Sequence, residues 1–139
     1  MRPIQVLSHR DAWLIVDAVR AALEKDGRGA AVAVSDEHGE LLAFLRTDGC
    51  PLPSILIAAN KAFTAARERK PSLEVGRASR SEGFPMTNFG DLRYTAWGGG
   101  LPLVVEGAVV GAIGVSGLPE MEDIVYADIG VQAFLASLR

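Results

Sequence analysis

Apolar residues dominate the stretch Gly98–Gly117, in which glycines recur between short runs of leucine, valine and isoleucine. Its β-branched residues favour strands, and its polar point, Glu106-Gly107, is typical of a hairpin turn. We therefore predict two strands, Leu101–Glu106 and Ala108–Ser116, joined by a tight turn. Two glycines inside the second strand indicate that a backbone, a helix or a flat ligand approaches closely there.

Helical periodicity recurs in four other segments, each with a start signal or an apolar face. Ser8 is a good N-cap for the first helix, and Gly27 ends it. Ser54 and Ser72 are the expected N-caps of the second and third helices. The predicted helices run from Ser8 to about Asp26, from Ile55 to about Lys70, from Leu73 to Ser79 and from about Met121 to Leu138.

Strand patterns fill most of the remaining chain. Ala30–Ser35 and Glu40–Arg46 flank the turn Asp36–Gly39 and predict a second hairpin. Leu92–Trp97 is expected to be a strand that leads into the glycine-rich hairpin. The polar stretch Arg80–Asp91 before it is a long loop for a compact domain, and such loops often bind ligands or form lids.

The predicted element order is helix, two strands, two helices, three strands, helix (αββααβββα). Hairpins separated by helices indicate an antiparallel sheet with helices packed on it, which is an α+β fold. The length of 139 residues predicts one domain over residues 1–139. No repeat or interdomain linker interrupts the pattern.

Hydrophobic content, net charge and cysteine count limit the kinds of binding partner that we expect. Hydrophobic residues make up 49% of the chain without a run long enough to span a membrane, so we expect a homo-oligomer, a dimer or larger, that buries apolar surface. The net charge of −3 gives no reason to expect nucleic acid or an anionic membrane as a partner. The one cysteine, Cys50, excludes an internal disulfide and a cysteine metal cluster. The N-terminus lacks the apolar core of a signal peptide, so a cytoplasmic location is expected.

Histidine offers few metal ligands in this chain. His9 and His38 are the only two, and neither lies in a metal-ligand spacing, so no metal site is predicted. His38 falls in the turn Asp36–Gly39, where it is either a solvated turn residue or an axial haem ligand or proton carrier.

Lys61 is the charged residue that stands out. It lies in the middle of an alanine-rich helix, on the same arc as Thr64. It is either a solvated surface lysine or, if the arc faces a cleft, a group that binds a carboxylate or transfers a proton. Asp36 closes the hairpin formed by Ala30–Ser35 and Glu40–Arg46, as aspartate commonly does in turns. Asp36 and Tyr94 are two further candidates for the proton-transfer group.

Two further groups are candidate ligand contacts. Gly98, Gly99 and Gly100 either cradle an anion with their backbone N–H groups or form a bulge at the strand entry. Aromatic and thioether side chains around the long loop either wall a flat apolar ligand or pack as a lid over the core. They are Phe84, Met86, Phe89, Tyr94 and Trp97.

Several of these segments together resemble a known family. The matching residues are Val32–Leu41, Phe44–Gly49 with Arg46 and Asp48, Pro53-Ser54-Ile55 with Ala58 and Ala59, Lys61–Ala65, Gly98–Leu103, Gly107, Gly111, Ile113–Gly117 and Asp123. In this order they are similar to the GlcG/HbpS-like haem-degrading-domain family over nearly the whole chain. The resemblance implies a five-stranded antiparallel sheet, oligomers, and haem binding in some members, sometimes with slow haem breakdown.

Three functional hypotheses follow. The first is a small-ligand-binding protein that takes haem or another tetrapyrrole near the glycine-rich hairpin. The second is a cofactor-independent enzyme for a small organic acid or polar metabolite, in which Lys61 holds an anionic group and Asp36 or Tyr94 moves a proton within hydrogen-bond reach of the substrate. The third is an assembly protein whose glycines serve subunit packing. The resemblance places the first hypothesis ahead.

Overall fold

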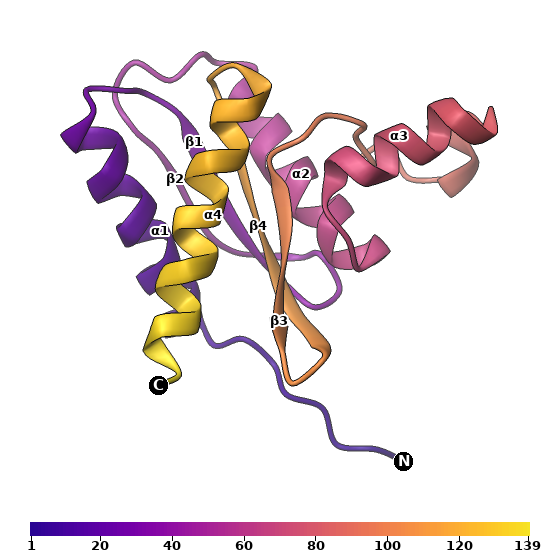
Figure 1. Cartoon of the computed structure of the whole chain (residues 1–139), viewed down its shortest axis with the longest axis horizontal. Helices are drawn as coiled ribbons and strands as arrows, with labels where there is room; N and C mark the ends of the chain where they lie inside the picture. The colour runs from indigo at the N-terminus through magenta and orange to yellow at the C-terminus, as the bar shows by residue number, and fades with distance from the viewer.

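The computed structural model describes residues 1–139, with a four-stranded antiparallel sheet between two layers of helices (Figure 1). The strands lie in the order β2-β1-β4-β3. The elements are α1 (His9–Lys25), β1 (Ala31–Asp36), β2 (Leu41–Arg46), α2 (Ser54–Glu68), α3 (Ser72–Glu82), the 3-10 helix η1 (Met86–Phe89), β3 (Gly100–Val105), β4 (Ala108–Ser116) and α4 (Glu120–Ser137). The α+β class and the two hairpins are confirmed.

The two faces of the sheet carry side chains of different size. On β1, Val32 and Val34 belong to the main core with α1 and α4, whereas Ala31 and Ala33 pack against Ala58 and Ala62 of α2 and its neighbours. This alternation follows from the two-residue period of a strand. Figure 1 shows α1 and α4 together on one side of the sheet and α3 projecting from the other elements. Large aliphatic side chains therefore separate α1 and α4 from the sheet, while α2 lies close against it.

Glycine allows that close approach of α2. A Cβ added to Gly114 of β4 would overlap the carbonyl oxygen of Ala58 and lie 2.7 Å from the amide nitrogen of Ala62. Any side chain at this position would therefore push α2 away from the sheet. The expected close approach of a helix is confirmed at Gly114. At Gly111 the neighbour is instead the Ser35 carbonyl oxygen of β1.

Local signals fixed two elements accurately. The Ser8 hydroxyl accepts from the Asp11 amide while the Asp11 carboxylate accepts from the Ser8 amide, which is a capping box at the start of α1. Between β3 and β4, Glu106 and Gly107 both have positive φ, 49° and 80°. Two consecutive positive φ values suit the right-handed twist of a two-residue hairpin.

The expected fifth strand, Leu92–Trp97, is wrong. This segment lies over α2 instead of beside β3, because its backbone bonds to side chains. The Thr64 hydroxyl accepts from the Thr95 amide at 3.0 Å and donates to the Arg93 carbonyl, and the Arg93 amide donates to Asp91. A segment satisfied in this way has no need of a neighbouring strand. The sheet consequently ends at β3.

Two expected helix caps are also wrong. Pro53 and Pro71 occupy the N-cap positions of α2 and α3, and neither helix has a side-chain cap. Ser54 is the first residue of α2, directly after its N-cap Pro53. The Ser72 hydroxyl donates to the Trp97 carbonyl and accepts from the Gly100 amide instead of capping α3. The third helix is also longer than expected, because it continues to Glu82. No helix is both long and apolar enough to cross a bilayer.

Candidate functional site

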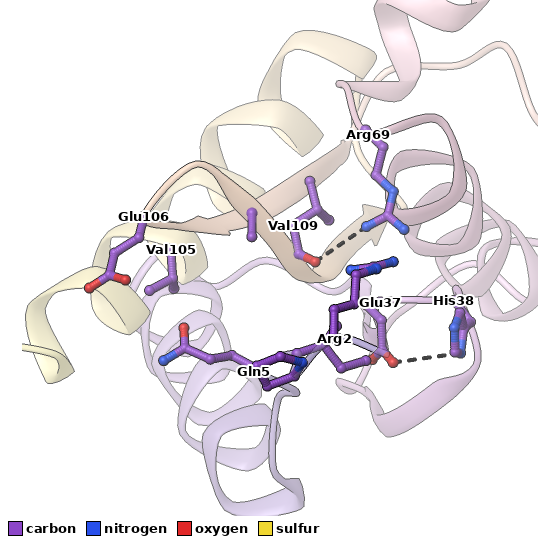
Figure 2. Close-up of a pocket in the computed structure, with 11 residues that line it drawn as sticks. Arg2, Gln5, Glu37, His38, Arg69, Val105, Glu106 and Val109 are labelled. Carbon is purple, nitrogen blue, oxygen red and sulfur yellow. Dashed lines mark hydrogen bonds and ion pairs between the residues drawn. The ribbon is translucent and has the colours of Figure 1, made fainter.

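A pocket of about 650 Å³ lies where the turns of the two hairpins meet the N-terminal segment (Figure 2). We call it the turn pocket. It is lined by Arg2–Gln5 of the N-terminal segment, Glu37 and His38 of the β1–β2 turn, Arg69 after α2, and Val105, Glu106, Ala108 and Val109 of the β3–β4 hairpin. Its size is within the range of small-molecule sites.

His38 is held at the turn pocket by its backbone. The Asp36 carboxylate accepts from the His38 and Glu40 amides, each at 2.9 Å, which fixes the turn. The His38 carbonyl in turn accepts from the Arg67 guanidinium at 2.7 Å. The His38 side chain itself is 69% exposed, and its Nδ1 lies 3.6 Å from a Glu37 carboxylate oxygen. The backbone is therefore fixed while the imidazole stays accessible to a ligand.

Two cations and an apolar wall complete the turn pocket. Arg69 ends α2 in the left-handed conformation and donates to the Val109 carbonyl at 3.3 Å. Arg2 lies opposite on the N-terminal segment (Figure 2). Ile4 and Val105 line the same pocket. The pocket thus combines a group that can ligate a metal, two guanidinium groups that can bind carboxylates, and apolar surface.

Asp36, Glu37 and His38 also form a cluster whose ligand atoms lie within 4.8 Å of one another. The Asp36 oxygen Oδ1 already accepts two backbone N–H groups of the turn. Exposed acidic groups commonly gather in turns, so this cluster alone does not indicate a metal site.

A second pocket, of about 480 Å³, lies at the beginning of α2 and α4, and we call it the lysine pocket. Its floor is an ion pair between Lys61 and Asp123, whose side chains are only 3% and 4% exposed. The Lys61 ammonium donates to Asp123 at 3.0 Å and to the Val115 carbonyl at 2.9 Å. The other Asp123 oxygen accepts from the Leu118 amide at 3.0 Å. The pair is therefore both buried and hydrogen-bonded, the condition under which a buried pair is tolerated.

Burial shifts the ionisation of Asp123. Removal from water raises the pKa of Asp123, whereas the adjacent Lys61 ammonium and the Leu118 amide oppose the rise. Lys61 is covered because Gly99 lies directly over it. A Cβ added at Gly99 would lie 2.9 Å from the ammonium nitrogen. A lysine on a polar arc of α2 is thus buried by the chain segment that crosses it.

The segment Gly98–Gly100 lies beside Lys61, but two of its three backbone amides already donate hydrogen bonds to side chains of the chain. The Gly98 amide donates to Glu120 at 2.9 Å, and the Gly100 amide donates to Ser72 at 2.9 Å. The geometry therefore does not form the anion cradle that was one of the two interpretations. An added Cβ on Gly100 would overlap the Lys61 carbonyl, so close packing against α2 accounts for the glycine.

The aromatic residues form a separate cluster beyond Thr64. The rings of Phe89 and Tyr94 stack at 4.2 Å, and Tyr94 meets Phe63 edge-on at 5.1 Å. The Arg93 guanidinium lies 4.0 Å from the centre of the Phe63 ring. Burial raises the pKa of Tyr94. These rings line neither of the two pockets, and among the predicted aromatic contacts Trp97 alone lines one, the lysine pocket.

The structure does not bring the predicted catalytic residues together. Lys61 faces the lysine pocket, Asp36 is engaged in the β1–β2 turn, and Tyr94 lies in the aromatic cluster. Of the three residues, only Lys61 lines either of the two pockets. The two pockets therefore do not unite the three groups in one site, and Thr64 is occupied by the loop that it binds.

Some lining residues carried no signal in the sequence. Arg2 and Arg69 are separated by about half of the chain, and their meeting depends on how the N-terminal segment passes the β3–β4 turn. Ser116 lies in a short Gly-Val-Ser-Gly context that is too common to be informative. The Asp123 match to the family was the one available signal for the partner of Lys61.

Comparisons with known proteins agree on one family. The model of the family described as "Haem degrading protein HbpS-like" matches residues 7–132. The protein GlcG of Escherichia coli K12 is 33% identical over 122 residues, which cover 84% of this chain and 85% of GlcG. The crystal structure of a double mutant of HbpS from Streptomyces reticuli is 33% identical, with a TM-score of 0.85 over 95% of this chain and 89% of that one. A PduOC:haem complex, at 23% identity and a TM-score of 0.84 over 93% and 95% of the two chains, has the same fold.

Proposed function

Because the chain belongs to the HbpS-like family of haem-degrading proteins, we propose that it binds haem in the turn pocket, with His38 as a ligand to the iron. The observation that carries the proposal is that His38, Arg2 and Arg69 line one pocket. An imidazole is a common iron ligand in haem proteins. The description of the family as haem-degrading supports haem as the ligand.

The donor set of the turn pocket fits haem. His38 supplies an accessible imidazole on a fixed turn. Arg2 and Arg69 supply positive charge for the two propionate carboxylates, since guanidinium groups bind carboxylates through paired hydrogen bonds. Ile4, Val105 and Val109 supply apolar surface for the macrocycle. When bound, haem supplies a redox-active iron; this chain binds and orients it.

A hemin titration of the purified protein tests the proposal. We expect a saturable Soret band that is lost or strongly shifted in His38→Ala. His9→Ala is the matched control, because His9 is an exposed histidine at the start of α1 outside the pocket. In Arg69→Ala we expect the Soret position to be kept and the affinity to fall by about tenfold, which corresponds to one charge-assisted contact.

Two results would overturn the proposal. One is a titration that never saturates, and the other is a His38→Ala spectrum identical to that of the unmodified protein. Following the Soret band over time with a reductant and oxygen measures breakdown of bound haem as a separate property.

The homo-oligomer expected from the composition is supported by exposed apolar side chains. Trp13 is 53% exposed on α1, Met121 and Val125 are 63% and 58% exposed on α4, and Leu52 and Leu56 are 70% and 67% exposed around the start of α2. Light scattering coupled to size exclusion measures the subunit number. A monomer at all concentrations would contradict this part of the proposal.

A further inference from the structure

We propose that the lysine pocket is a second binding site, and that its ligand is a small, uncharged, polyhydroxylated molecule such as a polyol or a sugar. The pocket lies at the end of α2 away from the turn pocket and shares no lining residue with it. The argument rests on the polar groups that the pocket leaves free and on the charge around them.

Two buried hydroxyls face this pocket without a partner. Ser54 and Ser116 are 6% and 5% exposed, and both line the pocket. Neither hydroxyl forms a hydrogen bond within the chain, although every fully enclosed polar side-chain atom has a partner. Their oxygens therefore reach the pocket space. Because these hydroxyls have no partner in the chain, both can bond to a ligand that replaces water.

The ion pair on the floor offers further contacts. The Lys61 ammonium has three protons, and its partners within the chain are Val115 and Asp123. A third N–H therefore has no partner within the chain, and Lys61 lines the pocket. The Asp123 carboxylate keeps acceptor capacity beyond its bonds to Lys61 and Leu118. The pocket thus presents donors and acceptors side by side.

The charge around the pocket is balanced. Asp123 neutralises Lys61, and the Glu120 carboxylate at the rim accepts from the Gly98 amide. The N-termini of α2 and α4 meet here, and together they add roughly one positive charge, which offsets Glu120. A balanced pocket gives no net attraction to an anion or a cation. Hydroxyl groups, which both donate and accept, match the free Ser, Lys and Asp atoms.

One wall of the pocket is apolar. Ile57, Leu118 and Trp97 line it, and Trp97 is 59% exposed. An indole ring offers a broad apolar surface, against which the C–H face of a polyol or a sugar ring can pack. Such a wall beside a few convergent polar groups is the usual make-up of a small-molecule site.

A titration of the full chain with glycerol, xylitol and glucose tests this inference, followed by ¹H–¹⁵N spectra. We expect at least one of them to give saturable shifts at the amides of Gly99, Gly117 and Leu118. Ser54→Ala and Ser116→Ala should each raise the dissociation constant by about three- to tenfold, as expected for one hydrogen bond. Ser81→Ala is the matched control, because Ser81 is exposed on α3.

Each outcome has a defined meaning. No saturable shift with any of the three compounds overturns the inference. So does binding that both serine variants leave unchanged, or a parallel titration in which glycolate, used as an anionic comparison, binds more tightly than any neutral compound. Saturable binding that persists in His38→Ala supports a site separate from the turn pocket, so this inference and the haem proposal stand or fall independently.

Discussion

Replacing Lys61 with methionine removes one charge of the buried pair while keeping a side chain of similar length. Two buried acceptors, an Asp123 oxygen and the Val115 carbonyl, then lose the ammonium that bonds to them at 3.0 and 2.9 Å. Breaking a buried pair from one side costs about 3–5 kcal/mol, since the remaining charge is uncompensated. A domain with about 5–15 kcal/mol of stability remains folded or becomes marginal.

The cost in Lys61→Met should depend on pH in a defined direction. Burial raises the pKa of Asp123, and the variant lacks the ammonium that opposes this rise. A carboxyl group with a higher pKa in the folded state binds its proton more tightly there than in the unfolded chain. Protonation of Asp123 therefore stabilises the folded variant fully below the pKa that this group has in the unfolded chain. The stabilisation is lost as the pH rises through the higher pKa that it has in the folded state. The gap between variant and unmodified protein should narrow on acidification.

The difference in unfolding free energy between Lys61→Met and the unmodified protein is measured by urea unfolding, followed by far-UV circular dichroism. The protein concentration is fixed, and the pH is varied from about 5 to about 8. The double variant Lys61→Met/Asp123→Leu is the control, because it leaves no buried charge and should recover much of the loss. If Lys61→Met costs less than about 1 kcal/mol at every pH, or if the two substitutions simply add, the pair is not the buried unit described above.

Three further predictions concern the fold and the turn. Gly114→Ala should lower the free energy of unfolding by about 3 kcal/mol, because the added Cβ would overlap the backbone of α2. Gly83→Ala is the control: its Cβ meets open space at a positive φ, so it should cost only about 1 kcal/mol. Equal costs of the two substitutions in thermal unfolding would refute the packing argument. Ser8→Ala should cost about 1 kcal/mol by the same assay through loss of the capping box, whereas an unchanged midpoint would contradict it. Asp36→Ala should release the turn and weaken hemin binding several-fold without abolishing the Soret band, since it holds the His38 backbone, and an unchanged affinity would show that this turn does not position the imidazole.

Elements with local signals were predictable from the sequence. The helix after Ser8 carries its own cap, and the hairpin at Glu106-Gly107 carries its own turn. In both, residues within four positions of one another determine the conformation. The hairpin at Asp36 is of the same kind, because the aspartate bonds to the turn that it closes.

Elements that depend on distant partners were not predictable in the same way. The pattern of Leu92–Trp97 suits a strand, yet its partner is Thr64 of α2, about thirty positions earlier in the chain. Likewise, the polar arc of α2 does not reveal that Gly99 covers Lys61. Both pockets combine segments from across the chain. Candidate residue types were therefore accessible from the sequence, whereas their grouping required the fold.

The close packing of α2 against the sheet has a thermodynamic consequence for the ligands of the two pockets. Alanine and glycine let this helix pack closely on the sheet, and its two ends line different pockets. Because a close-packed interior transmits strain, we expect a displacement of α2 at the Ser54 end to reach Arg69 at the other. If occupancy of one pocket changes affinity at the other, linkage requires the reverse effect to be of equal size. Measuring hemin affinity with and without a bound polyol gives that coupling free energy directly.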